Sequence, residues 1–472
     1  MSDHLGTFWR LVVVSAIAVS TMSHAADENT AGQEGPAKLS RDVPHPISNP
    51  LSTVMLEGAW VPEDPQQIDF ENLPRTPAQH AVVSDVRGEG GKRVNQHAYL
   101  VHYDGLFWTM WSDGPGISRG YGRVPGHDQP GQRVSFATSK DGLNWCDVQD
   151  LSGPPEKGFG YIARGFWQRD GELLALASHF YAPGYRGRGL SLEAFRWNRA
   201  AERWESAGTV QDDAMNNFPP KRLPNGEWMM SRRDHRGQVT VMVGGVKAID
   251  QWKIMPLSYG GKQRPEEPYW YVLPDGKNLV GLFRDGSGSK RLLRAFSTDN
   301  GWSWSKLVRT DFPDATSKFF AMLTSRGYYA MVSNANPRRR DPLTLAISQD
   351  GLVYTHLFYL VGGRHVDYPH MIEHDGRLLI AFSGAKQTME VLRVSLNDVD
   401  ELIAFSRGKR AVEVAKAPLS SVNAMLNKSK RTDAQTVMII NKGISGRNSR
   451  NGMSMAEICI SHSQKSNKLL RY

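Results

Sequence analysis

The chain has 472 residues, 40% of them hydrophobic and 22% charged, with a formal net charge of +9 at pH 7. It is long enough for one large domain, and two cysteines, Cys146 and Cys459, exclude a disulfide framework. Residues 407–472 hold 13 lysines and arginines against 3 acidic residues, so the remainder is nearly neutral and the charge does not predict nucleic-acid binding.

The first 25 residues have the pattern of an export signal. Arg10 precedes an apolar run over 11–19, and small residues at 23–25 provide a cleavage site. The run is too short to span a bilayer comfortably. We therefore expect an exported protein, periplasmic or secreted, with no stable membrane insertion after signal removal. Residues 26–50 are polar and rich in Gly, Pro and Ser, which predicts a flexible lead-in.

A hairpin pattern recurs along residues 51–405: an extended apolar run, a tight turn, and a second run. The turn glycines are Gly105, Gly171, Gly226, Gly276, Gly327 and Gly376. A repeat near 50 residues with a hairpin in each unit predicts an all-β fold, a β-propeller of four-stranded blades. Six blades are favoured. Residues 51–62 are expected to complete the last blade, and residues 76–87 are left over as the possible start of a seventh.

A second motif repeats between the expected third and fourth strands. It begins at Ser139, Ser297 and Ser348, and in each copy an Asp, a Gly and an aromatic residue follow (SKDGLNW, STDNGWSW and SQDGLVY). The Asp accepts hydrogen bonds from turn amides, the Gly adopts a positive φ, and the aromatic ring packs beneath the turn. This motif resembles the Asp box of the sialidase superfamily, which includes exo-sialidases, other glycosidases and polysaccharide lyases. The resemblance implies a glycan-binding pocket on the propeller axis and leaves the reaction open.

Propeller topology places the first-strand starts and second-strand ends of all blades on one face. The first-strand starts are Asn95, Gln96, His97, Arg164, Asn216, Asn217, Glu266, Glu267, Lys318, Tyr368 and His370. The second-strand ends are Trp111, Asp113, His179, Arg232, Arg233, Asp234, Arg284, Asp285, Asn334, Asn336 and Lys386. Because all six repeats direct polar residues to this face and only ordinary turn residues to the other, we expect a ligand site there.

Roles follow from the chemistry of each side chain. The catalytic candidates are His97, Glu266, Glu267, Tyr185 and His370. The candidates for substrate binding are Asn95, Gln96, Trp111, Asp113, His179, Arg232, Arg233, Arg284, Asn334 and Lys386. The three arginines either clamp a carboxylate or form salt bridges between blades. Trp111 is either core or a sugar platform. The HFYAPGYRGRG loop at 179–189 offers aromatic rings that can stack on sugars, or is a plain surface loop.

Three histidines, His97, His179 and His370, lack the short spacing of metal ligands, so no metal and no other cofactor is expected. Residues 406–472 lack sustained periodicity, which predicts a basic, disordered tail. The pattern does not predict an oligomeric state.

The resemblance also supplies a contrast. An exo-sialidase would carry an arginine in an F-R-I-P-like motif near the first blade, an arginine triad and a Tyr–Glu nucleophile pair. Here NQHAYLV occupies the first-blade region. This start and the WSDGPG loop resemble propellers that act on polysaccharides containing uronate or rhamnose. We therefore predict an enzyme that cleaves an acidic or rhamnose- or uronate-containing oligo- or polysaccharide. A glycoside hydrolase is favoured over a β-eliminating lyase, and a non-catalytic glycan-binding propeller is the third reading.

Overall fold

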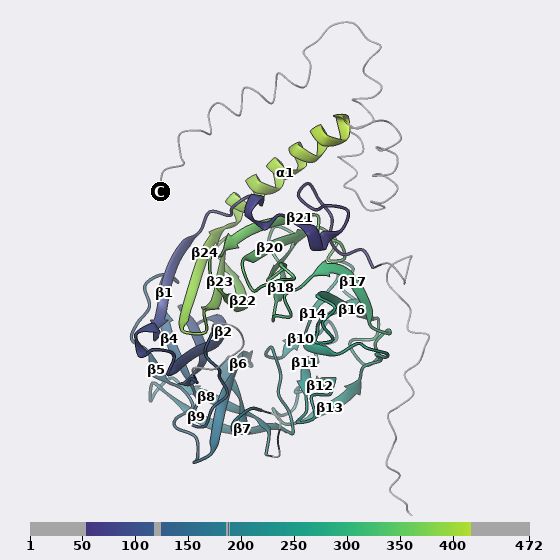
Figure 1. Ribbon diagram of the computed structural model, residues 1–472. Coiled ribbons are helices and arrows are strands. Elements are labelled where there is room, and N and C mark those ends of the chain that lie inside the picture. The colour runs from purple at the N-terminus through teal and green to yellow at the C-terminus, as the bar shows by residue number, and fades with distance from the viewer. Residues whose placement is uncertain (1–52, 118–123, 186, 188, 417–472) are drawn as a thin grey trace, which may run out of the picture. The chain divides into compact units, whose positions relative to one another are not determined.

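The computed structural model describes residues 53–117, 124–185, 187 and 189–416, and these residues form a six-bladed β-propeller (Figure 1). Each blade is a four-stranded antiparallel sheet, which confirms the predicted fold. Blade 1 contains β2 (Arg93–Tyr103), β3 (Leu106–Pro115), β4 (Arg133–Ser139) and β5 (Gln149–Asp150). Blade 2 contains β6 (Phe159–Arg169), β7 (Glu172–Tyr181), β8 (Ser191–Asn198) and β9 (Arg203–Asp212).

The remaining blades follow in chain order. Blade 3 contains β10 (Lys221–Arg222), β11 (Trp228–Arg233), β12 (Val239–Gly244) and β13 (Trp252–Pro256). Blade 4 contains β14 (Pro265–Val272), β15 (Leu279–Asp285), β16 (Arg291–Ser297) and β17 (Val308–Pro313). Blade 5 contains β18 (Phe320–Leu323), β19 (Tyr329–Ser333), β20 (Leu343–Ser348) and β21 (His356–Val361). Blade 6 contains β22 (Val366–His374), β23 (Arg377–Gly384), β24 (Thr388–Ser395) and β1 (Gln79–Asp85).

The amino-terminal strand β1 closes the ring by pairing antiparallel with β24. Closure therefore comes from residues 79–85, which corrects our expectation for residues 51–62 and leaves no strand for a seventh blade in the described part of the chain. The earlier segment lies against blade 5 instead, where Leu56 forms a parallel bridge with Tyr354. The Asp311 carboxylate, on β17 of the adjacent blade 4, also anchors the segment by accepting hydrogen bonds from the amides of Met55 (2.7 Å) and Leu56 (3.1 Å).

The turns adopt the geometry that their residues predicted. Asp104 and Gly105, in the first hairpin, both have positive φ (54° and 74°), as a two-residue turn of this hand requires. In the first Asp box, Asp141 accepts hydrogen bonds from the amides of Leu143 (2.9 Å) and Asn144 (2.8 Å). Asp350 accepts from two turn amides in the same way, whereas the Asp299 carboxylate accepts from the amide of Ser303.

The helices lie outside the blades. α1 (Leu396–Lys416) follows β24 and crosses the boundary that we placed at residue 405. Leu396, Val399 and Ile403 recur at helical spacing and pack into the main hydrophobic core. The short 3-10 helices are η1 (Pro65–Gln67), η2 (Phe70–Asn72) and η3 (Arg87–Glu89). None of these described helices is long and apolar enough to cross a membrane. The expected signal peptide, the lead-in and residues 417–472 of the expected tail lie outside the described residues.

Candidate functional site

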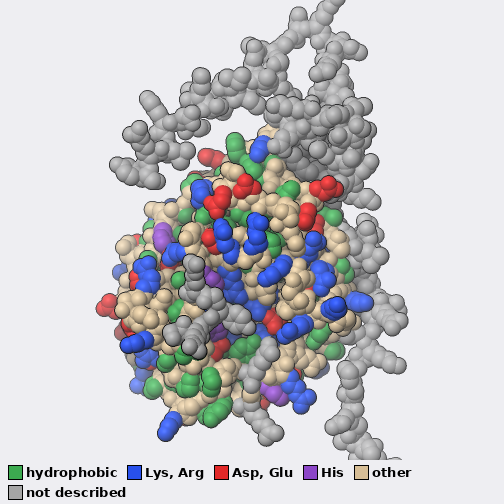
Figure 2. All heavy atoms as spheres, in the orientation of Figure 1, with side chains coloured by type: hydrophobic (Ala, Val, Ile, Leu, Met, Phe, Trp, Pro, Cys, Tyr) green, Lys and Arg blue, Asp and Glu red, His purple; other side chains and the backbone are tan. Residues whose placement is uncertain are grey.

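A cavity of about 800 Å³ opens where the inner strands begin, and residues from all six blades or their loops line it. Eight arginines and lysines line this cavity, against three aspartates and glutamates. Figure 2 shows Lys and Arg side chains gathered around a central hollow on this face of the propeller. Because clefts lined by one sign of charge concentrate ligands of the other sign, the cavity favours an anionic ligand.

A repeated backbone irregularity directs key side chains into the cavity. The inner strands of blades 1, 4 and 6 each contain a register shift, at Gln96/Tyr99, Glu266/Tyr269 and Asp367/His370. Within each shift one residue has a left-handed backbone: His97 (φ 61°), Glu267 (φ 46°) and Tyr368 (φ 58°). All three line the cavity. Residues other than glycine rarely adopt this conformation, and such bulges redirect side chains beside functional sites.

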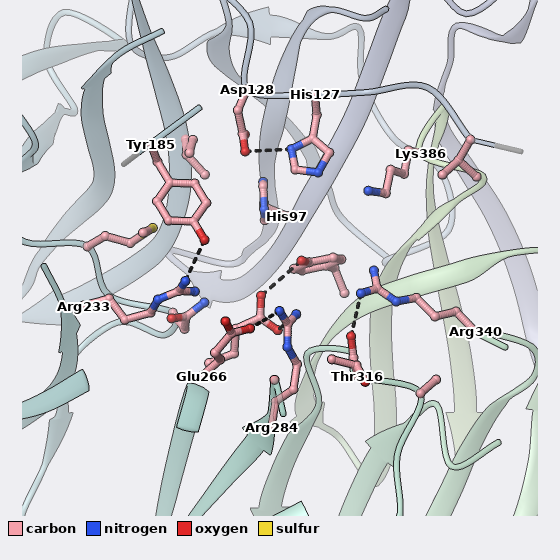
Figure 3. Close-up of a pocket in the computed structure, with 18 of the residues that line it drawn as sticks. His97, His127, Asp128, Tyr185, Arg233, Glu266, Arg284, Thr316, Arg340 and Lys386 are labelled. Atoms are coloured by element: carbon pink, nitrogen blue, oxygen red, sulfur yellow. Dashed lines mark hydrogen bonds and ion pairs between the residues drawn. The ribbon is translucent and has the colours of Figure 1, made fainter. Parts of the chain in front are cut away.

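A tyrosine–carboxylate–arginine group lines the cavity, and Figure 3 shows its arginine, Arg284, beside Glu266. The hydroxyl of Tyr368 donates to Oε1 of Glu267 at 3.1 Å. Arg284 donates to Oε2 of Glu267 at 2.7 Å and also pairs with Glu266. Burial opposes ionisation of Glu267, but the Arg284 and Arg233 charges lower its pKa overall, so it is a carboxylate at neutral pH. Burial, reinforced by the Glu267 charge, raises the pKa of Tyr368.

A second cationic group lies across the cavity from Arg233. Arg340 donates to Asp367 at 2.7 Å, and His365 lies 2.9 Å from the same carboxylate. Lys386 has a left-handed backbone (φ 56°), is buried, and its ammonium group has no hydrogen bond or ion pair with any described residue. Burial lowers its pKa, although the Asp367 charge acts in the opposite direction. An anionic group of a ligand would supply the missing partner.

A histidine–aspartate pair lies in the loop between β3 and β4. Nδ1 of His127 is 2.9 Å from Oδ2 of Asp128. Burial opposes ionisation of Asp128, but the His127 and Arg164 charges lower its pKa overall. The His97 ring lies between this pair and Tyr368, with ring centroids 5.9 Å from His127 and 4.9 Å from Tyr368. Burial lowers the pKa of His97, so its ring is neutral at pH 7.

Comparison with known proteins agrees with this architecture. A family model described as a BNR repeat-like domain matches residues 199–380. Sequence comparison with curated proteins finds no match. A Dyadobacter fermentans protein of unknown function has a similar structure, with 14% identity, a TM-score of 0.54, and coverage of 67% of this chain and 98% of that one. The NanB sialidase of Streptococcus pneumoniae has 10% identity, a TM-score of 0.52, and coverage of 68% and 71%.

This chain has the sialidase-like, BNR-repeat propeller fold. A further solved structure, named sialidase, is 17% identical with a TM-score of 0.51, and the match covers 73% of this chain but 35% of that protein. Structural similarity at such low sequence identity establishes the fold alone. The chemistry has to be argued from the residues of the site.

The sialidase-like propeller brings seven of the predicted site residues together in the cavity: His97, Tyr185, Glu266, Glu267, Arg233, Arg284 and Lys386. Tyr185 comes from the loop after β7, and its hydroxyl accepts a hydrogen bond from Arg233 at 2.6 Å. Arg284 is not a purely structural bridge between blades, because both of its carboxylate partners belong to its own blade and line the cavity.

The other predicted residues do not line the cavity. The side chains of Asn95 and Trp111 bond to each other at 3.1 Å, and Trp111 is fully buried core. Gln96 is fully buried beside His97. His370 accepts a hydrogen bond from the Leu100 amide at 3.1 Å, and its ring packs on Phe320.

The remaining four make local contacts. Asp113 pairs with Arg93, Arg232 pairs with Asp213, and Asn334 donates to the carbonyl oxygens of Pro342 and Val366. His179, near the end of β7, lies 3.0 Å from Glu156.

Several cavity residues were absent from the predicted face, among them His127, Asp128 and Arg340. These three lie in loops between the second and third strands of their blades, where first-strand starts and second-strand ends carry no information. Tyr368 was among the first-strand starts on the predicted face but was given no role. It precedes the hairpin glycine Gly376 by eight residues, as His97 precedes Gly105.

Proposed function

We propose that this chain is a glycoside hydrolase that cleaves the bond beside an acidic sugar, with Tyr368 as nucleophile and Glu267 as its base. The observation that carries the proposal is the buried Tyr368–Glu267 hydrogen bond, 3.1 Å long, inside a cationic cavity. A tyrosine nucleophile is an established alternative to the usual carboxylate pair in glycoside hydrolysis.

The first step uses the tyrosine–carboxylate–arginine group of the cavity. As Oη of Tyr368 attacks the anomeric carbon, its proton passes to Glu267 and the bond to the leaving oxygen breaks. Arg284 holds the Glu267 carboxylate in place through the 2.7 Å hydrogen bond. Water then attacks the anomeric carbon of the glycosyl–tyrosine intermediate and gives a proton to His127, which lost its own to the leaving group, while the protonated Glu267 returns its proton to the departing Tyr368 oxygen. Two displacements at one carbon retain the anomeric configuration.

The leaving oxygen needs a proton, and the His127–Asp128 pair is placed to give one. The Asp128 carboxylate lies 2.9 Å from Nδ1 of His127 and orients the ring. A histidine held in this way can act as the general acid for the leaving oxygen. In the second step the His127 ring accepts the proton of the attacking water.

The substrate carboxylate would bind to Lys386 and Arg340. Arg340 already has a partner in Asp367, whereas the Lys386 ammonium has none among the described residues. Lys386 thereby supplies a cation near blade 1. This blade carries His97 and lacks the arginine that an exo-sialidase would have there. An acidic sugar also explains why the nucleophile is a neutral phenol, because a second carboxylate would be repelled by the substrate charge.

A product assay tests this function. Wild-type protein and Tyr368→Phe are incubated with sialosides, glucuronides and uronate-containing polysaccharides, and reducing ends and near-ultraviolet absorbance are followed together. We expect reducing ends without absorbance from the wild type, and loss of that activity in the variant. Absorbance that rises with reducing ends would indicate an unsaturated uronate and a lyase. Glycan binding without turnover would indicate a binding propeller.

A further inference from the structure

A cluster of aromatic side chains lies on blade 2, at the face where the cavity opens. It consists of Phe159 at the start of β6 and of His179 and Tyr181 at the end of β7, and we call it the blade 2 rim. Tyr181 is 58% exposed, whereas His179 and Phe159 are half-buried. The exposed face of the Tyr181 ring is available for a ligand to stack on it.

The rim is built in advance of any ligand. The Phe159 and His179 rings stack with centroids 4.7 Å apart and planes 4° apart. The Tyr181 ring meets Phe159 edge-on at 5.3 Å. Gly158 lies under the Tyr181 ring, because a Cβ there would come within 3.2 Å of it. The stack on one side and the glycine below fix the Tyr181 ring without covering it.

Backbone hydrogen bonds tie the rim to the proton donor of the proposed reaction. The Gly184 amide donates to the carbonyl oxygen of Asp128 at 2.8 Å. On the other side of the same loop, the Gly131 amide donates to the carbonyl oxygen of Phe159 at 2.8 Å. Tyr181 also precedes the cavity residue Tyr185 by four residues, a span of at most about 14 Å of extended chain. The rim therefore adjoins the side of the cavity from which a protonated leaving group departs.

We propose that the blade 2 rim binds a neutral sugar of the leaving group, so that the substrate is an oligosaccharide and not a simple glycoside. The proposal rests on the proposed hydrolase function. The aliphatic hydrogens of a sugar ring stack on the open face of Tyr181, and the two-torsion side chain loses little entropy in doing so. Glu156, 72% exposed and 3.0 Å from His179, offers a carboxylate to the sugar hydroxyls at the edge of the rim.

Two substrates with the same acidic sugar isolate this contribution. One is the methyl glycoside, whose leaving group cannot reach the rim, and the other is an oligosaccharide with neutral sugars on the leaving side. We expect Tyr181→Ala to lower kcat/KM on the oligosaccharide about three- to tenfold more than on the methyl glycoside, mainly through KM. Tyr181→Phe keeps the ring and should remain close to wild type. Phe405→Ala, which removes an equally exposed ring on α1, is the matched control.

The outcomes separate the two proposals. If the wild type hydrolyses both substrates and Tyr181→Ala affects them equally, or neither, the rim proposal is overturned and the hydrolase stands. If the wild type hydrolyses neither, the hydrolase fails, and calorimetric binding of the oligosaccharide then tests the rim. Affinity weakened at least threefold by Tyr181→Ala, but not by Phe405→Ala, would still support the rim. Equal affinities, or no binding to the wild type, would refute it.

Discussion

Glu267→Gln is the substitution that the site geometry makes most informative. The side chain is buried and bonds to both Tyr368 (3.1 Å) and Arg284 (2.7 Å). The amide keeps the shape and one acceptor oxygen but cannot take the phenol proton. General-base catalysis contributes about 10²- to 10⁴-fold to a rate. We therefore expect kcat to fall by that factor, which corresponds to about 2.7–5.4 kcal/mol of transition-state stabilisation.

The matched control is Glu266→Gln. Glu266 is the adjacent residue, lines the same cavity and pairs with the same Arg284, whereas the Tyr368 hydroxyl donates to Glu267. Its replacement removes a charge from the cavity and leaves the base intact, so we expect at most about a tenfold fall in kcat.

The assay is initial-rate kinetics on the acidic glycoside that the product assay identifies, with thermal melting of each variant. Melting within a few degrees of wild type would show that both variants fold. Equal losses in kcat would refute the assignment of Glu267 as the base, since the two substitutions remove the same charge. So would a Glu267→Gln enzyme with wild-type kcat.

Three further predictions concern other groups. Lys386→Met should lower kcat/KM on an acidic glycoside about 10- to 150-fold, the value of a charged hydrogen bond, and Lys386→Arg should restore most of it. His127→Gln should slow cleavage of an alkyl glycoside at least tenfold more than that of a nitrophenyl glycoside, whose leaving group needs no proton. Glu390→Gln should destabilise the ring closure by about 1–3 kcal/mol in denaturant unfolding, because the partly exposed Arg364 and His80 lose a charged hydrogen-bond partner that water only partly replaces.

The same Glu390 carboxylate predicts a dependence of stability on pH. Burial opposes its ionisation, but His80 and Arg364 together lower its pKa from 4.5 to about 2. A lowered folded-state pKa contributes stability that is complete above the unfolded pKa and is lost as pH falls toward the folded value. The wild-type Tm should therefore fall between about pH 4.5 and pH 2, and the Tm of Glu390→Gln should fall less over the same range.

Much of the fold could be predicted from sequence because its signals are local. Each hairpin turn and each Asp box is built from residues within a few positions of one another, such as Asp141 with Leu143 and Asn144. Ring closure was harder, because the pairing of β1 with β24 joins residues about 300 positions apart. Residues 51–62 were expected to supply the closing strand, but Leu56 pairs with Tyr354 beside blade 5 and Asp311 of blade 4 binds the amides of Met55 and Leu56.

The site was predicted less completely, for a reason in the backbone. A bulge in the inner strand reverses the alternation of side chains, so that Tyr368 enters the cavity while His370 turns into the core. Asn95 and Trp111 look available in the sequence, yet each satisfies the other's hydrogen bond. Pairings of this kind form between strands and leave no trace in the spacing of residues along the chain.

The central claim, that Tyr368 is the nucleophile of a glycoside hydrolase, is tested most directly by trapping the intermediate. A fluorinated glycosyl fluoride of the hydrolysed sugar is incubated with the wild type, and the digested protein is mapped by mass spectrometry. We predict one adduct with the mass of the fluorosugar, on the peptide that contains Tyr368, and none on Tyr368→Phe. An adduct on Glu266 or Glu267, or rapid hydrolysis with inversion and no adduct, would contradict the account.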